Sequence, residues 1–136
     1  MKVPLPKHEW SKIRRRAERF PEPAFDFVRD GLAHTVGMVH GADAADANNS
    51  PQVNRHVSGQ QLCLGLRDLA IQRWGRLAPV VLGRWGIHRT EDFGVMVYAM
   101  IDRESMRPSG DDTFGDFRDV YDFDEAFAPE SLTGQH

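Results

Sequence analysis

The 136-residue sequence contains one cysteine, Cys63, and no long hydrophobic run. A single cysteine excludes a disulfide framework within the chain and a zinc site built on cysteine ligands. No apolar run approaches the roughly 20 residues that are needed to cross a bilayer. No apolar segment follows the basic N-terminal stretch, as it would in a secretory signal. We therefore expect a soluble, cytoplasmic protein with no membrane span.

The sequence also lacks the motifs of common catalytic sites. It has no H-E-x-x-H, G-x-S-x-G, P-loop or G-x-G-x-x-G pattern. Its six histidines are scattered, and His34 and His40 are too far apart for neighbouring turns of one helix. The acidic run from Asp111 departs from the calcium-loop pattern, because Thr113 and Gly115 stand where Asp or Asn is needed. We predict no catalytic residue, metal site or cofactor, and keep an enzyme of unrecognised type as the third hypothesis.

Charge is unevenly distributed along the chain, although the net charge is only -3. Residues 1–20 carry seven basic residues against two acidic ones, whereas residues 102–136 carry three against ten. The candidate nucleic-acid ligands are the basic residues Lys7, Lys12, Arg14, Arg15, Arg16 and Arg19. They could hold phosphates without sequence preference, rest on an anionic membrane or pair with the chain's own acidic end. Because charge runs on helices are usually solvated faces, we favour pairing with the acidic end.

Hydrophobic periodicity predicts that most of the chain is helical. Apolar residues recur at spacings of three and four in segments 22–37, 58–74, 76–85 and 90–104. Ser58 and Gln61 have the spacing of a capping box, and Thr90 is expected to cap the helix that follows it. A short basic helix is also predicted within residues 1–20. We expect the helix at 22–37 to pack on the outside of the others.

The periodicity changes after residue 106, where turn-forming residues precede a segment rich in β-formers. This pattern predicts a β-hairpin over residues 107–123. Helices followed by a hairpin are the order of a winged-helix domain. We therefore predict a mostly helical α+β fold, winged-helix-like, with four to five helices and a C-terminal β-hairpin. The predicted domains are a basic arm at 1–20, a globular domain at 21–127 with a mobile loop at 40–54, and a flexible tail at 128–136.

Three blocks of the sequence resemble an uncharacterised protein family. The blocks are HVSGQQLCLGLRDLAIQRWG, VLGRWGIHRTEDFG and DFRDVYDFDEAF. The family is a domain of unknown function found in planctomycetes and verrucomicrobia, and the resemblance covers roughly residues 22–127. It implies no activity, substrate or catalytic residue.

A helix, a tight turn and a second helix raise the question of DNA reading. Away from its apolar stripe, however, the segment 90–104 offers four acidic residues and one arginine, and phosphates would be repelled. We therefore predict a non-enzymatic protein-interaction or self-association module, whose partner is another protein or a second copy of the chain. The candidate contact residues are Tyr98, Arg103, Asp119 and Tyr121. Nucleic-acid binding through the basic N-terminal helix is the alternative.

Overall fold

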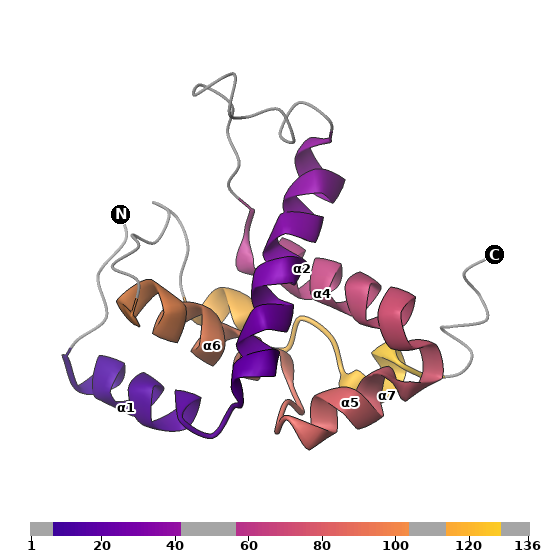
Figure 1. Cartoon of the computed structure of the whole chain (residues 1–136). Coiled ribbons are helices and arrows are strands. Elements are labelled where there is room, and N and C mark those ends of the chain that lie inside the picture. Colours follow the sequence, from indigo (N-terminus) through magenta and orange to yellow (C-terminus); the bar gives the residue numbers. More distant parts are fainter. Residues whose placement is uncertain (1–6, 42–56, 104–113, 129–136) are drawn as a thin grey trace.

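The computed structural model describes residues 7–41, 57–103 and 114–128, and every regular element among them is helical (Figure 1). The α-helices are α1 (Lys7–Ala17), α2 (Glu22–His40), α4 (Gly59–Trp74), α5 (Ala78–Arg84), α6 (Thr90–Arg103) and α7 (Phe123–Ala126). Two 3₁₀ turns accompany them, η2 (Gly75–Leu77) and η3 (Phe114–Phe117). The predicted α+β class is therefore wrong for the part of the chain that the structure describes.

The helix α2 lies across the middle of the molecule and packs mainly against α4 (Figure 1). Its Phe25, Phe27 and Val28 are each at most 2% exposed, because they face the core formed with α4 and α6. The prediction of an outer helix at this position is therefore wrong. The helix also runs past Gly37 to His40, and residues 42–56, which contain most of the predicted loop at 40–54, lie outside the described part.

The close approach of α2 to α4 depends on residues without side chains. A Cβ atom placed on Gly65 would overlap the hydroxyl of Thr35, and one on Gly31 would overlap the side chain of Leu66. The Thr35 hydroxyl is itself fixed, because it donates a hydrogen bond of 2.6 Å to the Gly31 carbonyl. Glycine at these positions lets the two backbones come close enough for dense packing.

The helix α4 begins as the sequence predicts. The Ser58 side chain accepts from the Gln61 amide at 3.0 Å, and the Gln61 side chain accepts from the Ser58 amide at 2.9 Å. This reciprocal pair satisfies two amides that a helix start would otherwise leave without partners. The helix ends at Gly75, whose φ of +52° lies in the left-handed region that glycine tolerates.

The helix α6 is the most deeply buried element of the core. Phe93, Val95 and Met96 are fully buried, since α1 covers one side of the helix and η3 covers another. The helices α1 and α6 lie side by side and run in opposite directions (Figure 1). A helix covered in this way has little surface left for a groove of DNA or for a protein partner.

The predicted β-hairpin is wrong where the structure describes it, and residues 104–113 lie outside the described part. The backbone after η3 finds its partner in α6: the Thr90 hydroxyl donates to the Phe117 carbonyl at 2.6 Å and accepts from the Val120 amide at 3.2 Å. The Asp122 side chain accepts from two amides at the start of α7, so the chain turns into a helix there. The β-forming residues of this segment therefore contact helices, and no strand is present in the described part of the chain.

Candidate anion-binding site

The helix α1 is attached to the core through one face and presents arginines on the other. Ile13, Ala17 and Phe20 recur at spacings of four and three and are each at most 7% exposed. Arg15, Arg16 and Arg19 point to solvent because they occupy the remaining positions of the same turns. The packing therefore fixes the helix on the core and leaves its guanidinium groups accessible.

The turn between α5 and α6 brings a second set of basic side chains to the same place. The turn is made at Gly86, whose φ of +83° suits glycine, and the Ile87 amide donates back to the Leu82 carbonyl at 2.9 Å. Ile87 is buried, whereas the next two residues, His88 and Arg89, are exposed. Because α6 runs antiparallel to α1, its first turn lies beside the last turn of α1.

Asp92 holds this turn in position. Its Oδ2 atom accepts from the His88 amide at 2.8 Å and from the Arg89 amide at 3.2 Å. The residue is 4% exposed, so the carboxylate is buried beneath the turn. Two N–H donors offset part of its charge.

An open depression of about 370 Å³ lies where α1 meets this turn. It is lined by Arg16, Arg19, His88, Arg89 and Asp92. Three arginines from two segments that are far apart in the sequence thus line one space together with a single aspartate. This arrangement favours a bound anion, because guanidinium forks match the oxygens of phosphate and carboxylate groups.

None of Arg16, Arg19 and Arg89 forms an ion pair with another residue that the structure describes. Arg19 lies above the Phe20 ring, with its guanidinium carbon 5.9 Å from the ring centroid, and this contact orients the side chain without neutralising its charge. Pairing of these arginines with the acidic end of the chain is therefore not seen among the described residues. Their positive charge remains available to a ligand.

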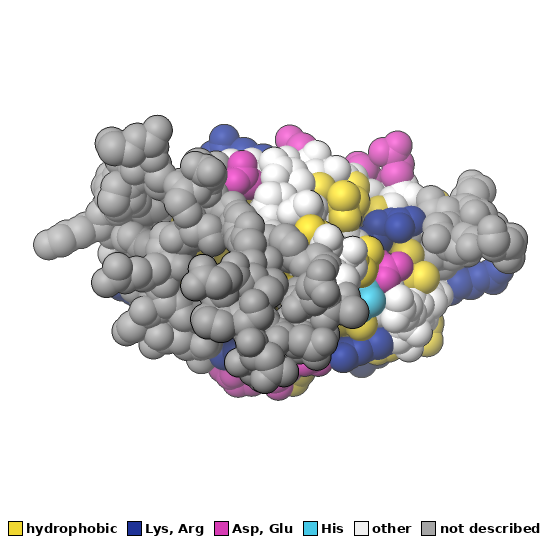
Figure 2. Space-filling model, turned by 90° about the horizontal axis from the view of Figure 1, so that it is seen from above, with side chains coloured by type: hydrophobic (Ala, Val, Ile, Leu, Met, Phe, Trp, Pro, Cys, Tyr) yellow, Lys and Arg dark blue, Asp and Glu magenta, His cyan; other side chains and the backbone are white. Residues whose placement is uncertain are grey.

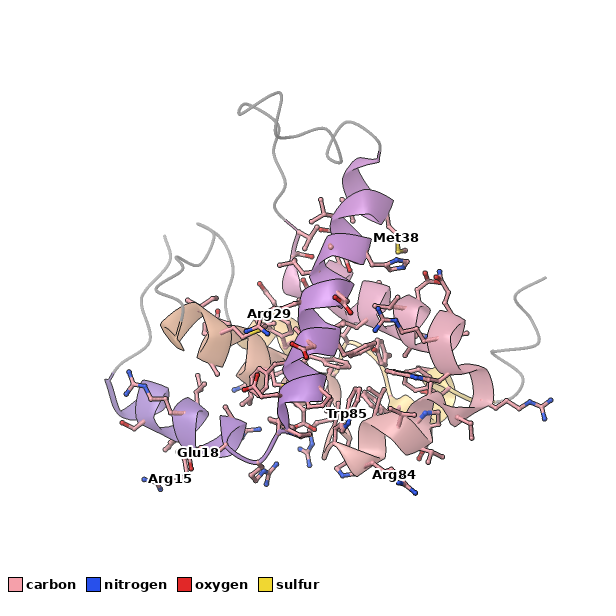
Figure 3. The ribbon with its side chains drawn as sticks, in the orientation of Figure 1. Arg15, Glu18, Arg29, Met38, Arg84 and Trp85 are labelled. Atoms are coloured by element: carbon pink, nitrogen blue, oxygen red, sulfur yellow. The ribbon has the colours of Figure 1, made fainter. Side chains whose placement is uncertain are left out.

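The basic surface extends beyond the depression. Arg15 on α1 and Arg84 on α5 both lie along the lower edge of the molecule in Figure 3, Arg15 toward the left with Glu18 beside it and Arg84 toward the right. The described part of the opposite face, seen in Figure 2, intersperses basic and acidic side chains. We call the surface formed by Arg15, Arg16, Arg19, Arg84, His88 and Arg89 the basic face.

A second open depression, of about 410 Å³, lies on the other flank of α1. Its walls include the buried rings of Phe20 and Phe25, and its polar groups are Arg14, Glu18 and Glu22. Arg14 and Glu22 each have an interaction within the protein. Mixed charge makes this space a poorer site for an anion than the first depression.

A histidine and an aspartate meet between α2 and α4, where an enzyme could carry a catalytic pair. His34 Nε2 lies 2.7 Å from Asp68 Oδ2, and the Gln72 amide donates to the same oxygen at 2.8 Å. The contact between His34 and Asp68 links α2 to α4.

The thiol of Cys63 is a poor nucleophile, because burial and then the Glu91 carboxylate raise the pKa of Cys63 from 9.0 to about 12.

The structure places the two tyrosines that were predicted to contact a partner inside the protein. Tyr98 is 5% exposed, with its ring 6.4 Å from that of Phe117, so it belongs to the core. Tyr121 is half-buried, and its hydroxyl donates to the Cys63 carbonyl at 2.9 Å. Burial, the first of several causes, raises the pKa of Tyr121 well above its ordinary value of 10. Both tyrosines are therefore used inside the protein.

The other predicted residues lie on the surface or outside the described side chains. Asp119 is exposed and has a φ of +48°. Lys12 and Arg14 are exposed and each have an interaction within the protein. The side chains of Lys7 and Arg103 lie outside the described part. Of the six predicted nucleic-acid ligands, the structure brings Arg16 and Arg19 together at one depression.

Sequence reasoning missed His88, Arg89 and Asp92 as members of a site. The only local signal was a basic pair directly before the predicted cap at Thr90. The contact between this turn and α1 is tertiary, and no spacing in the sequence reports it.

Comparisons with protein-family models, with curated proteins and with solved structures gave no match. The resemblance to an uncharacterised family of planctomycetes and verrucomicrobia therefore stays a prediction. Within the described ranges, no helix is both long and apolar enough to cross a membrane. The same residues contain no group of three or more side chains suited to hold a metal ion.

Proposed function

We propose that this chain is a binding module that holds the phosphate backbone of a nucleic acid on its basic face. The observation that carries the proposal is the convergence of Arg16, Arg19 and Arg89 on one open depression without an ion pair among the described residues. Phosphate contacts by arginine supply most of the affinity of binding that does not depend on sequence.

The geometry favours backbone contact over reading of bases. The helix α6 has Phe93, Val95 and Met96 in the core and is covered by α1 and η3, so it has little surface left to enter a groove of DNA. The arginines come instead from the last turn of α1, from the residues directly after it and from the turn before α6. We therefore expect affinity for many sequences, with strong dependence on salt.

Fluorescence anisotropy with a labelled DNA duplex of mixed sequence tests the proposal. We expect the wild-type protein to bind at low salt and the triple variant Arg16→Ala, Arg19→Ala, Arg89→Ala to bind at least about tenfold more weakly. The slope of log affinity against log salt should fall by about 0.9 for each phosphate contact that is removed. Absence of binding by the wild-type protein at low salt would refute the proposal.

Arg118 provides the matched control. It is exposed and lines neither depression, so Arg118→Ala removes the same charge elsewhere. We expect this variant to keep the wild-type affinity and the wild-type salt slope. Equal losses in Arg118→Ala and in a single variant of the depression would show that net charge alone drives the binding.

Self-association is the second candidate function, and one observation favours it. Asp119 and Asp124 are exposed and form no ion pair with another described residue, so acidic and basic surfaces are both left open. Two copies of the chain would pair these surfaces head to tail, or another protein would take the place of the second copy. Sedimentation of the free protein distinguishes this candidate, because self-association by charge should be strongest at low salt.

A further inference from the structure

We infer that the depression lined by Arg16, Arg19, His88 and Arg89 binds a terminal phosphate of a nucleic acid in preference to an internal phosphodiester. The inference rests on the proposed function and names the ligand group that this part of the basic face selects. Four features carry it: the charge in the depression, its donors, its buried carboxylate and its size.

The charge in the depression matches a phosphomonoester better than a phosphodiester. Three guanidinium groups stand against one carboxylate, which is 4% exposed and already accepts two amide hydrogens. A phosphomonoester carries a charge of about -1.5 to -2 at neutral pH. An internal phosphodiester carries a single negative charge and leaves part of the guanidinium charge without a counterpart.

The donors for the ligand must be side chains. The amides of His88 and Arg89 both donate to Asp92 Oδ2, so the backbone of the turn is occupied by the protein itself. The guanidinium groups of Arg16, Arg19 and Arg89 form no ion pair with a described residue. A terminal phosphate has three free oxygens, and an internal phosphate has two. The terminal phosphate can therefore accept hydrogen bonds from one more guanidinium group than the internal phosphate can.

Asp92 lowers the affinity of the depression for any anion that makes only one guanidinium contact. Asp92 lines the space, so its carboxylate repels an incoming negative charge, while its hydrogen bonds to the turn keep it in place. A ligand must make several guanidinium contacts to offset this repulsion. The volume of about 370 Å³ is at the lower end of the range for small-ligand sites, and it suits the end of a strand.

The test compares two single-stranded oligonucleotides of one sequence, one with a 5′-phosphate and one with a 5′-hydroxyl. Anisotropy should show about tenfold tighter binding of the phosphorylated strand by the wild-type protein, the effect of one further charge-assisted interaction. Arg89→Ala should bring the two affinities together. Equal affinity of the wild-type protein for both strands would overturn the inference and leave the proposed function intact.

Two further variants separate the depression from the rest of the basic face. Arg84→Ala should weaken the binding of both strands by the same factor, so the preference for the 5′-phosphate persists. Asp92→Asn keeps an oxygen acceptor for the turn but removes the negative charge. We expect it to bind the phosphorylated strand a few-fold more tightly than the wild-type protein. A loss of preference in Arg84→Ala as large as that in Arg89→Ala would contradict the assignment to this depression.

A small probe distinguishes failure of the inference from failure of the proposed function. Thymidine 5′-monophosphate, titrated while backbone amide NMR signals are followed, should shift the signals of His88 and Arg89. If it does so but neither oligonucleotide binds, the proposed function is refuted and the phosphomonoester site stands. A phosphoserine peptide that binds more tightly than the phosphorylated strand would overturn the assignment to nucleic acid.

Discussion

The α2–α4 interface and the basic face differ in how they use charged side chains. At the interface, Arg73 pairs with Asp30 at 2.9 Å and His34 contacts Asp68 at 2.7 Å, so each of these polar side chains has its partner on the opposite helix. On the basic face, Arg16, Arg19 and Arg89 form no ion pair with a described residue. The first region uses polar side chains to join two helices, whereas the arginines of the second contact no acidic side chain in the described part of the chain.

The two regions also differ in packing. The interface depends on Gly31 and Gly65, where the backbones approach so closely that a Cβ atom would overlap its neighbour. The basic face surrounds open space instead. Substitutions at the interface should therefore change stability, and substitutions on the basic face should change binding.

The largest effect on stability is expected from Gly65→Ala. The new Cβ would overlap the Thr35 hydroxyl, which cannot move without losing its hydrogen bond to the Gly31 carbonyl. We expect the free energy of unfolding to fall by about 1–3 kcal/mol, the usual cost of overpacking a core. Urea denaturation followed by circular dichroism measures this change.

Gly37→Ala is the matched control for that substitution. Gly37 is exposed on α2, and a Cβ there would meet nothing within 4 Å. Alanine should raise the free energy of unfolding by about 0.5–1 kcal/mol, because glycine in a helix interior costs that much. Equal changes in the two variants would show that the close approach of α2 to α4 is unimportant for stability.

An intermediate effect on stability is expected at alkaline pH, because the thiol of Cys63 on α4 is buried. Cys63 has a pKa of about 12 in the folded protein against 9.0 in an unperturbed chain. The unfolded chain therefore loses this proton first, so the stabilisation is fully present below about pH 9 and declines as pH rises toward 12. Between about pH 8 and pH 10 the free energy of unfolding should fall by about 1.4 kcal/mol from this group.

Denaturation of wild-type protein and Cys63→Ala at both pH values checks this expectation. The variant has no thiol, so its pH dependence should be smaller by the contribution of Cys63, whatever its loss of packing. The comparison ends near pH 10, the ordinary pKa of a tyrosine. Above that pH, Tyr121, whose pKa is also raised, contributes a similar loss of stability. Parallel pH profiles of the two proteins would contradict a thiol buried in this way.

The helices could be predicted from the sequence because their signals are local. The capping box at Ser58 and the apolar spacing from Phe93 onward each lie within a few residues, and α4 and α6 begin where these signals place them. The segment after η3 could not be predicted, because its β-forming residues are held by Thr90 and Cys63, which are distant in the sequence. For such residues, tertiary contacts override intrinsic preference.

The candidate site was predictable in part. The basic character of α1 is visible in the sequence, and Arg16 and Arg19 were among the predicted ligands. The prediction that Tyr98 contacts a partner came from a helical pattern that shows one apolar stripe but not how many neighbours cover the helix. The pairing of α1 with the turn at His88 and Arg89 depends on the antiparallel packing of α1 and α6. No pattern within one segment contains that information.

The smallest effect on stability is expected when Arg73, which forms an ion pair, is compared with Arg16, which forms none with a described residue. Arg73→Ala removes an ion pair with Asp30 whose two side chains are 40% and 53% exposed, so we expect a loss of about 0.2–1 kcal/mol. Arg16→Ala removes no ion pair to a described residue and should change stability by less than about 0.5 kcal/mol. A double-mutant cycle of Arg73→Ala with Asp30→Ala isolates the contribution of the ion pair to stability.

Arg16→Ala should instead weaken DNA binding, which Arg73→Ala leaves unchanged. If Arg16→Ala destabilised the fold as much as Arg73→Ala, the arginines of the basic face would be serving the structure rather than a ligand.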